Sequence, residues 1–368
     1  MVYAKMSALV AALSWPVRLL SQLLDRIVAV LDAGPAAGQP GAVRLRRGLA
    51  VVTFVLALVV SVRSARSGGV VSPPAVLMLV LAVALYTNRG GRFVHDWVPA
   101  ALAFFSYALV AAAVPDLGLS VHYTPQIDAE RLLAFGSLPT HWLQEHLYGG
   151  ATGALEVFSL LMYLSHFLVP VLLACLIWLF WPGRGFHDLL FGIIVVSFLG
   201  DLTFLLAPTA PPWLAAEHGL IAPVEPVLER GLADLGLHDL AALKGDAEAY
   251  NVVAAIPSLH AAWPVIALLV IRKHGLPRWL FWAQAVVTVG VLFAIVYTGE
   301  HYLVDALVGA VYALAAWWIV QRALGAASVR APATAGPNEL AARLPTVPQP
   351  APAVTPAVEA TAEPERVL

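Results

Sequence analysis

Apolar residues along the chain gather into eight long segments, each separated from the next by a polar stretch. The segments lie near residues 48–62, 74–87, 97–114, 154–181, 187–207, 254–273, 279–298 and 301–323. A helix of about 20 apolar residues is long enough to cross the hydrocarbon core of a bilayer. The pattern therefore predicts an all-α, polytopic membrane helix bundle with about eight spans.

The segments at 48–62 and 74–87 are short for a span, and two interpretations of them stay open. In the first, flanking arginines extend both spans by reaching into the headgroup region. In the second, the two segments form a re-entrant pair that is buried against the rest of the protein.

Composition divides the chain into three regions. Residues 1–47 contain an amphipathic helix at 14–33, expected to lie flat on the membrane, followed by a Gly/Pro/Ala linker. Residues 48–323 form the predicted transmembrane catalytic domain. Residues 324–368 are rich in Ala, Pro and Thr, cannot bury a core, and are expected to be a disordered tail.

Two polar stretches inside the transmembrane domain predict elements at the membrane surface. Residues 128–148 carry apolar side chains at helical spacing, which predicts a surface helix broken near Pro139, with Trp142 at the interface. Residues 208–252 are acidic and rich in proline. They are too long for a simple turn and predict an outer loop or lid.

Composition supports the membrane assignment and excludes several classes of function. Hydrophobic residues make up 60% of the chain and charged residues only 12%, against about 25% in soluble domains. The net charge of −2 argues against a nucleic-acid partner. The single cysteine, Cys175, cannot form an intramolecular disulfide, and no Cys/His spacing indicates a metal site. No cofactor is implied.

The distribution of positive charge predicts an orientation. With the N-terminus inside, 16 of the 21 Lys and Arg residues fall on the inner side and 5 on the outer side. By the positive-inside rule, both termini are then cytoplasmic in a multi-pass protein of the cell membrane.

Candidate chemistry lies at the start of two apolar segments that one hairpin separates. Pro257-Ser258-Leu259-His260 opens one segment, and His301-Tyr302-Leu303-Val304-Asp305 opens the other. In the predicted topology both segments run inward from the outer face, so their N-termini meet at the extracytoplasmic side. Two helix N-termini together favour a bound phosphate.

The residue types suit phosphoryl transfer. His301 and Asp305 are four apart and would share one helix face, where a carboxylate fixes the tautomer of an imidazole. The other ring nitrogen of His301 is then free to attack phosphorus, and His260 can protonate the departing oxygen. Water or an acceptor alcohol would attack the resulting phosphohistidine.

These motifs resemble those of the type-2 phosphatidic acid phosphatase superfamily, which has a Pro-Ser-x-His motif and a later motif ending in His-x-x-x-Asp. The resemblance implies that His301 is the nucleophile, that Asp305 orients it, and that His260 is the acid. It also implies a six-helix core within about residues 90–323.

The chain departs from the phosphatases of that superfamily at their arginines. Their Ser-Arg pair would fall on Ala294-Ile295, and their Lys-x6-Arg-Pro motif has no counterpart before residue 208. The stretch Pro208-Thr209-Ala210-Pro211-Pro212 is similar instead to the inositolphosphotransferase branch, which includes fungal inositol phosphorylceramide synthase. The segments 95–97 and 128–143 are also similar to that branch.

Four further residues are candidates for binding the substrate or its phosphate: Ser258, Thr209, Asp201 and Lys244. Asp201 either touches a sugar hydroxyl or caps a neighbouring helix. Lys244 either binds phosphate or is a solvated charge. His166 is expected to be a satisfied polar group inside the bundle. Fewer cationic ligands would be consistent with a phosphodiester, which carries less negative charge than a monoester.

The leading hypothesis is an integral-membrane phosphotransferase that acts on a lipid phosphodiester. It would transfer phosphoinositol or a similar phospho-polyol group to a lipid or glycan alcohol. One alternative is a lipid phosphate or polyprenyl diphosphate phosphatase with the same site chemistry. The other is a non-catalytic transporter or scaffold that kept the fold. Membrane lipids are the expected partners, and the oligomeric state stays open.

Overall fold

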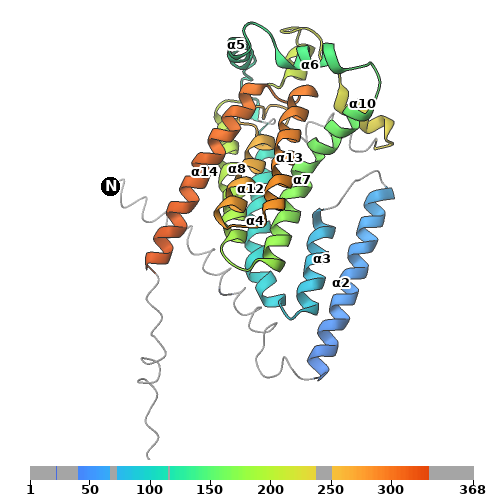
Figure 1. Cartoon of the computed structure of the whole chain (residues 1–368), viewed down its shortest axis with the longest axis vertical. Coiled ribbons are helices and arrows are strands. Elements are labelled where there is room, and N and C mark those ends of the chain that lie inside the picture. Colours follow the sequence, from blue (N-terminus) through green and yellow to red (C-terminus); the bar gives the residue numbers. More distant parts are fainter. Residues whose placement is uncertain (1–21, 23–39, 67–72, 115–116, 238–250, 331–368) are drawn as a thin grey trace, which may run out of the picture. The chain divides into compact units, whose positions relative to one another are not determined.

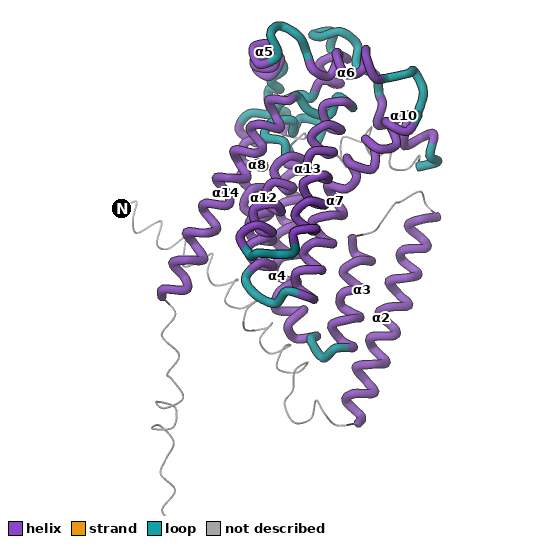
Figure 2. The backbone as a smooth tube through the Cα atoms, in the orientation of Figure 1, coloured by secondary structure: helices purple, strands orange, loops and turns teal. Residues whose placement is uncertain are grey.

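The computed structural model describes residues 22, 40–66, 73–114, 117–237 and 251–330, and this part of the chain is all-α. Its helices are α2 (Pro40–Arg66), α3 (Pro73–Tyr86), α4 (Gly90–Ala113), α5 (Thr124–Leu133), α6 (Pro139–Leu147), α7 (Ala154–Phe180), α8 (Gly185–Leu206), α9 (Pro212–Glu217), α10 (Val227–Asp234), α12 (Leu259–Lys273), α13 (Arg278–Tyr297) and α14 (Leu303–Arg330). The all-α part of the predicted fold class is confirmed (Figures 1 and 2).

Five helices in the described part of the chain are long and apolar enough to cross a membrane, which makes the protein multi-pass. They are α2, α7, α8, α13 and α14. The prediction of eight spans included three further segments, which correspond to α3, α4 and α12. None of these three is among the five. Helices α3 and α12 are short for a span, with 14 and 15 residues, and α4 carries Arg92 and Asp96 in its first two turns.

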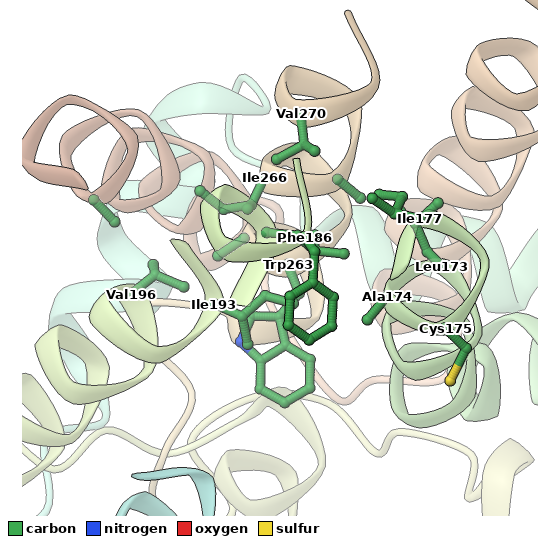
Figure 3. Packing of buried hydrophobic residues seen from close by; sticks show 14 of the residues in the cluster. Leu173, Ala174, Cys175, Ile177, Phe186, Ile193, Val196, Trp263, Ile266 and Val270 are labelled. Carbon is green, nitrogen blue, oxygen red and sulfur yellow. The ribbon is translucent and has the colours of Figure 1, made fainter. Parts of the chain in front are cut away.

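The short helix α12 is packed against α7, α8 and α13. Figure 3 shows its side chains Trp263, Ile266 and Val270 among residues of α7 and α8. A helix surrounded by protein does not need the full length of a lipid-facing span. The helix therefore lies within the bundle although it falls below the length of a span.

The start of α12 is set by tertiary contacts. The apolar segment was expected to become helical near residue 254, but Ala254 forms a parallel β-bridge with Thr209, and Val253 and Ala255 supply its two backbone hydrogen bonds. Ser258 is the N-cap, and its hydroxyl accepts the Ala261 N–H at 3.4 Å. Asn, Asp, Ser and Thr are favoured at this position because their oxygens satisfy N–H groups that have no partner within the helix.

Short helices gather at one end of the bundle, called the site end below (Figure 2). Helices α5 and α6 are separated by residues 134–138, which confirms the predicted break before Pro139. Helices α9 and α10 occupy part of the predicted lid at 208–252; residues 238–250, including Lys244, lie outside the described residues. So do the predicted amphipathic helix, apart from Gln22, and most of the tail predicted at 324–368, from residue 331 onward. Residues 324–330 were predicted to be disordered, but they belong to α14, so the predicted start of the tail is wrong.

The opposite end of the bundle is tied together by a buried carboxylate. Asp188 of α8 has no exposed side-chain surface and accepts hydrogen bonds from Lys273 at 2.7 Å and from His274 at 2.9 Å. Gln321 of α14 contacts both Asp188 and Lys273. These contacts link α8, α12 and α14, and so they support the placement of the two helices that carry the candidate site.

Candidate active site

His260 and His301 lie in direct contact at the site end of the bundle. His260 is in the first turn of α12, and His301 lies two residues before α14 begins. The distance from His301 Nε2 to His260 Nδ1 is 3.3 Å, and both side chains are buried. The fold therefore brings the two predicted catalytic imidazoles close enough to touch one phosphate group.

The surroundings of His301 Nδ1 determine which tautomer it adopts. Nδ1 lies 2.9 Å from the Ala255 carbonyl oxygen and 3.5 Å from Asp305 Oδ2. Both neighbours are acceptors only, so Nδ1 carries the hydrogen and donates it. In the neutral ring Nε2 then keeps its lone pair, and this is the nitrogen that faces His260.

Asp305 acts as a cap of α14 as well as a neighbour of His301. Its Oδ2 accepts the Tyr302 N–H at 2.9 Å, and its backbone carbonyl accepts the Ser258 N–H at 3.0 Å. The expectation that His301 and Asp305 share a helix face needs correction, because His301 precedes the helix. The spacing of four residues still brings them together, since the turn before α14 folds back onto the first helical turn.

The Ala255 carbonyl is held in place by three hydrogen bonds that involve Thr209. The Thr209 N–H donates to the Val253 carbonyl at 2.8 Å, and the Ala255 N–H donates to the Thr209 carbonyl at 3.2 Å. The Thr209 hydroxyl accepts the Ile256 N–H at 2.9 Å. On its other side Thr209 pairs with His122. Thr209 thus sits between two extended segments and fixes the peptide that orients His301.

A glycine allows α14 to approach the start of α12. A Cβ atom at Gly309 would lie 2.2 Å from the Ser258 carbonyl oxygen, a distance that real Cβ atoms do not show. Only a residue without a side chain therefore fits there. This close packing helps to bring the turn before α14 within reach of His260.

Ser258 and Thr209 were predicted to bind substrate, and both hydroxyls are engaged within the protein. Ser258 has no exposed surface and caps α12, while the Thr209 hydroxyl accepts the Ile256 N–H. A role for either residue in binding substrate stays a prediction.

Asp201 is buried near the end of α8, and neither of its carboxylate oxygens has a hydrogen-bond partner among the described residues. Ser197 accepts a hydrogen bond from Trp263 of α12, and Gly200 contacts Leu259. Helices α8 and α12 run in opposite directions here, so Asp201 lies level with the start of α12. The alternative role as a cap of a neighbouring helix finds no contact in the described part of the chain.

Three features of the site were missed by reasoning from the sequence. The carboxylate of Glu130 from α5 accepts the Leu303 and Val304 N–H groups, both at 2.9 Å. His166 stacks between His260 and Trp263, with ring centroids 4.1 and 4.2 Å apart. Its Nδ1 has no partner in the described residues, so the expectation of a satisfied polar group is wrong. Tyr163 stacks on His260 at 4.6 Å.

Basic residues near the site end are few. Arg230 pairs with Glu225 at 2.8 Å and donates to the Tyr148 hydroxyl. Ala294 and Ile295, at the positions of the phosphatase Ser-Arg pair, have fully buried side chains. Among the described residues, no group of three or more His, Cys, Asp or Glu side chains is arranged to hold a metal ion.

Comparison with known proteins identifies the family to which the site belongs. Residues 126–319 match the model of the PAP2 superfamily, the type-2 phosphatidic acid phosphatases and their relatives. The chain is 31% identical over 172 residues to the phosphoinositol dihydroceramide synthase of Bacteroides thetaiotaomicron. It is 28% identical over 179 residues to the inositol phosphorylceramide synthase of Candida albicans.

Each alignment covers 44% of this chain, but only 54% of the bacterial relative and 35% of the fungal one. The chain therefore matches about half or less of the length of these two curated relatives. No solved structure matches the chain significantly.

Proposed function

Because the chain belongs to the PAP2 superfamily of membrane enzymes, we propose that it is a phosphotransferase that acts on a lipid phosphodiester. It would move phosphoinositol, or a similar phospho-polyol group, to an alcohol on a lipid or glycan. Both curated relatives are named for products that join inositol, phosphate and a ceramide. The observation that carries the proposal is the contact between His301 Nε2 and His260 Nδ1, with His301 Nδ1 held by Ala255 and Asp305.

In the first step His301 Nε2 attacks the phosphorus of the donor lipid, phosphatidylinositol. The bond from phosphorus to the oxygen of the leaving diacylglycerol breaks. His260, in its protonated form, gives its proton to that oxygen. The anionic phosphodiester favours this protonated form when it enters beside the ring. The products are diacylglycerol and phosphoinositol bound to His301.

In the second step the acceptor alcohol attacks the phosphohistidine. His260, now neutral, takes the proton of the alcohol, and the nitrogen–phosphorus bond breaks to restore His301. Each step inverts the configuration at phosphorus, so the complete reaction retains it. Direct transfer between the two lipids would invert it once.

The proposal extends to recognition of the polyol. Asp201 is level with the start of α12 and has two buried carboxylate oxygens without a partner among the described residues. A carboxylate can accept hydrogen bonds from two neighbouring hydroxyl groups of inositol. We expect Asp201→Asn to lower kcat/KM for phosphatidylinositol by about tenfold and to leave that for phosphatidylethanolamine, which has no polyol, unchanged.

The low positive charge of the site supports a diester over a monoester. Arginines that clamp phosphate form paired, charge-assisted hydrogen bonds. Buried Ala294 and Ile295 cannot supply them. A phosphodiester carries one negative charge, whereas a monoester carries close to two at neutral pH. A site for a phosphodiester therefore needs one positive charge fewer than a site for a monoester, which fits the few basic residues found here.

The test uses the full-length protein in detergent micelles with inositol-labelled phosphatidylinositol and a panel of lipid alcohols, ceramide and dihydroceramide among them. Transfer of the intact phosphoinositol group to an alcohol supports the proposal. His301→Ala should abolish transfer and the acid-labile phosphoenzyme, and full turnover by that variant would overturn the assignment. Release of inorganic phosphate from phosphatidic acid, without transfer, would establish the phosphatase alternative instead.

The distribution of Lys and Arg supports an extracytoplasmic site with both termini in the cytoplasm. The topology is tested with Lys244→Cys in a Cys175→Ala background. A membrane-impermeant thiol reagent should label intact cells, and labelling only after the cells are opened would reverse the orientation.

A further inference from the structure

Glu130 lies on α5 and reaches the start of α14 at the site end of the bundle. Its side chain has no exposed surface, and its two carboxylate oxygens accept the Leu303 and Val304 N–H groups at 2.9 Å each. Leu303 and Val304 stand between His301 and Asp305 in the chain. The carboxylate therefore binds the backbone of the segment that carries the nucleophile, His301, and the carboxylate that orients it, Asp305.

Apolar packing holds α5 at the same place. Ile127 of α5 belongs to a buried cluster with Leu138, Ala215, Ile221 and Tyr302. Tyr302 is the residue that directly follows His301. Both the carboxylate and the apolar face of α5 thus contact the turn in which His301 lies.

The carboxylate occupies a position that phosphate-binding helices leave open. A helix N-terminus with free N–H groups attracts anions, and two such termini were expected to bind the substrate phosphate here. In α14 this capacity is already used, because Asp305 takes the Tyr302 N–H and Glu130 takes the next two. The substrate phosphate must meet His301 without help from these N–H groups.

The charge of Glu130 also acts on the site. Burial raises the pKa of the Glu130 carboxyl above its usual value, and the two N–H groups oppose this effect. The negative charge of the nearby Asp305 raises the pKa of Glu130 further. Glu130 thus places a carboxylate against two N–H groups between His301 and Asp305, and the carboxylate of Asp305 itself lies 3.5 Å from His301 Nδ1.

We propose that Glu130 is a positioning residue for His301 and, through its negative charge, a determinant of specificity for phosphodiesters over phosphomonoesters. This inference rests on the proposed function. Holding the start of α14 keeps His301 in line with His260. The negative charge repels a phosphate with two charges more strongly than a phosphate with one, and Coulomb repulsion is strong where water is excluded.

Two substitutions separate the effect of position from the effect of charge. Glu130→Gln keeps the shape but removes the charge, and its amide nitrogen cannot accept an N–H. Glu130→Asp keeps the charge but is one methylene shorter, so the contact with the two N–H groups is weakened. Asp128→Asn is the matched control, because Asp128 is an exposed carboxylate on the same helix.

The experiment compares the full-length variants at pH 8 in mixed micelles. Each receives phosphatidylinositol with an acceptor lipid as the diester reaction, and phosphatidic acid as the monoester reaction. For Glu130→Gln we expect kcat for the diester to fall about tenfold with little change in KM. The ratio of diester to monoester kcat/KM should fall about tenfold as well. Glu130→Asp should lose kcat to a similar extent but keep the wild-type ratio, and Asp128→Asn should match the wild type in both.

The outcomes distinguish this inference from the proposed function. If the wild type transfers phosphoinositol but Glu130→Gln keeps the wild-type ratio, the role in specificity is wrong. If the ratio of diester to monoester kcat/KM falls as far in Glu130→Asp as in Glu130→Gln, the change in specificity comes from altered structure and not from lost charge. The inference then fails. Should Glu130→Gln not fold, Glu130→Asp still tests the inference. A lower kcat with the wild-type ratio of diester to monoester kcat/KM supports it, and a lower ratio overturns it. A wild-type protein that only hydrolyses phosphatidic acid would overturn the proposed function and this inference together.

Discussion

Thr209 offers the sharpest test of how the nucleophile is oriented, because one substitution removes a single contact. The Ala255 carbonyl and the Ile256 N–H belong to the same peptide group. The carbonyl accepts from His301 Nδ1 at 2.9 Å, and the N–H donates to the Thr209 hydroxyl at 2.9 Å. Thr209→Val replaces that hydroxyl with a methyl group of nearly equal volume. The two backbone hydrogen bonds of Thr209 are retained.

The expected cost follows from the lost acceptor. A buried N–H left without a partner costs about 1–3 kcal/mol, and Ile256 is only half-buried, so about 1–2 kcal/mol of stability should be lost. The peptide is also freed to rotate, which carries the Ala255 carbonyl away from His301. Misplacement of a reacting group by about 1 Å can lower a rate by about a hundredfold. We therefore expect kcat to fall by about 10- to 100-fold.

The assay measures kcat and KM for phosphoinositol transfer in Thr209→Val and in Thr209→Ser, the control that keeps the hydroxyl. The positioning role predicts a lower kcat with KM nearly unchanged, and near wild-type values for the serine variant. If KM rises instead while kcat is unchanged, the hydroxyl binds substrate, as the sequence suggested. If neither constant changes, this hydrogen bond does not orient His301, and the reasoning is refuted.

Three further predictions concern the acid, the close packing of α14 and the buried carboxylate. His260→Gln should lower the rate by about 10²- to 10⁴-fold with phosphatidylinositol, but much less with a nitrophenyl phosphodiester whose leaving group needs no proton; equal losses would contradict the acid role. Gly309→Ala should destabilise the protein by about 1–3 kcal/mol, because its Cβ would meet the Ser258 carbonyl oxygen, and an unchanged melting temperature in detergent would show that the contact relaxes freely. Burial raises the pKa of Glu130 above 4.5, so between pH 4.5 and that raised value the folded protein holds a proton that the unfolded chain has lost. Stability should therefore fall as pH rises through this window, and Glu130→Gln should flatten the slope of melting temperature against pH.

The sequence was sufficient to predict the bundle and the pairing of His260 with His301. Apolar runs mark the helices because a bilayer imposes their length and composition. The two motifs each precede a helix, and one hairpin lies between them, so their starts must lie at the same end. The turn before α14 then places Asp305 beside His301 even though the helix begins two residues later than expected.

The partners of these residues could not be predicted, because they come from distant parts of the chain. The peptide that presents the Ala255 carbonyl to His301 is held by hydrogen bonds to Thr209, which lies 46 positions earlier than Ala255 in the chain. The contact of Glu130 with Leu303 spans 173 positions, and no pattern in α5 indicates it. The apolar run at 254–273 gave no sign that its first residues would pair with Thr209 instead of continuing the helix.

The two acceptors around His301 Nδ1 have different roles in the proposed mechanism. In the resting enzyme the Ala255 carbonyl is closer, at 2.9 Å, and Asp305 Oδ2 is farther, at 3.5 Å. The carbonyl is enough to fix the tautomer of a neutral ring. When Nε2 bonds to phosphorus the ring becomes positively charged, and a hydrogen bond from a charged donor to a carboxylate is about twice as strong as a neutral one.

Asp305 should therefore stabilise the transition state and the phosphohistidine more than the resting enzyme, which is the condition for a residue to raise kcat. Asp305→Asn would keep a neutral acceptor near the ring but lose this charge-dependent gain. The effect of Asp305→Asn should appear in kcat and in the amount of trapped phosphoenzyme. Thr209→Val should in addition disturb the orientation of His301 in the free enzyme, because it loosens the Ala255 contact. The resting geometry thus assigns tautomer control to a backbone carbonyl and charge stabilisation to a carboxylate.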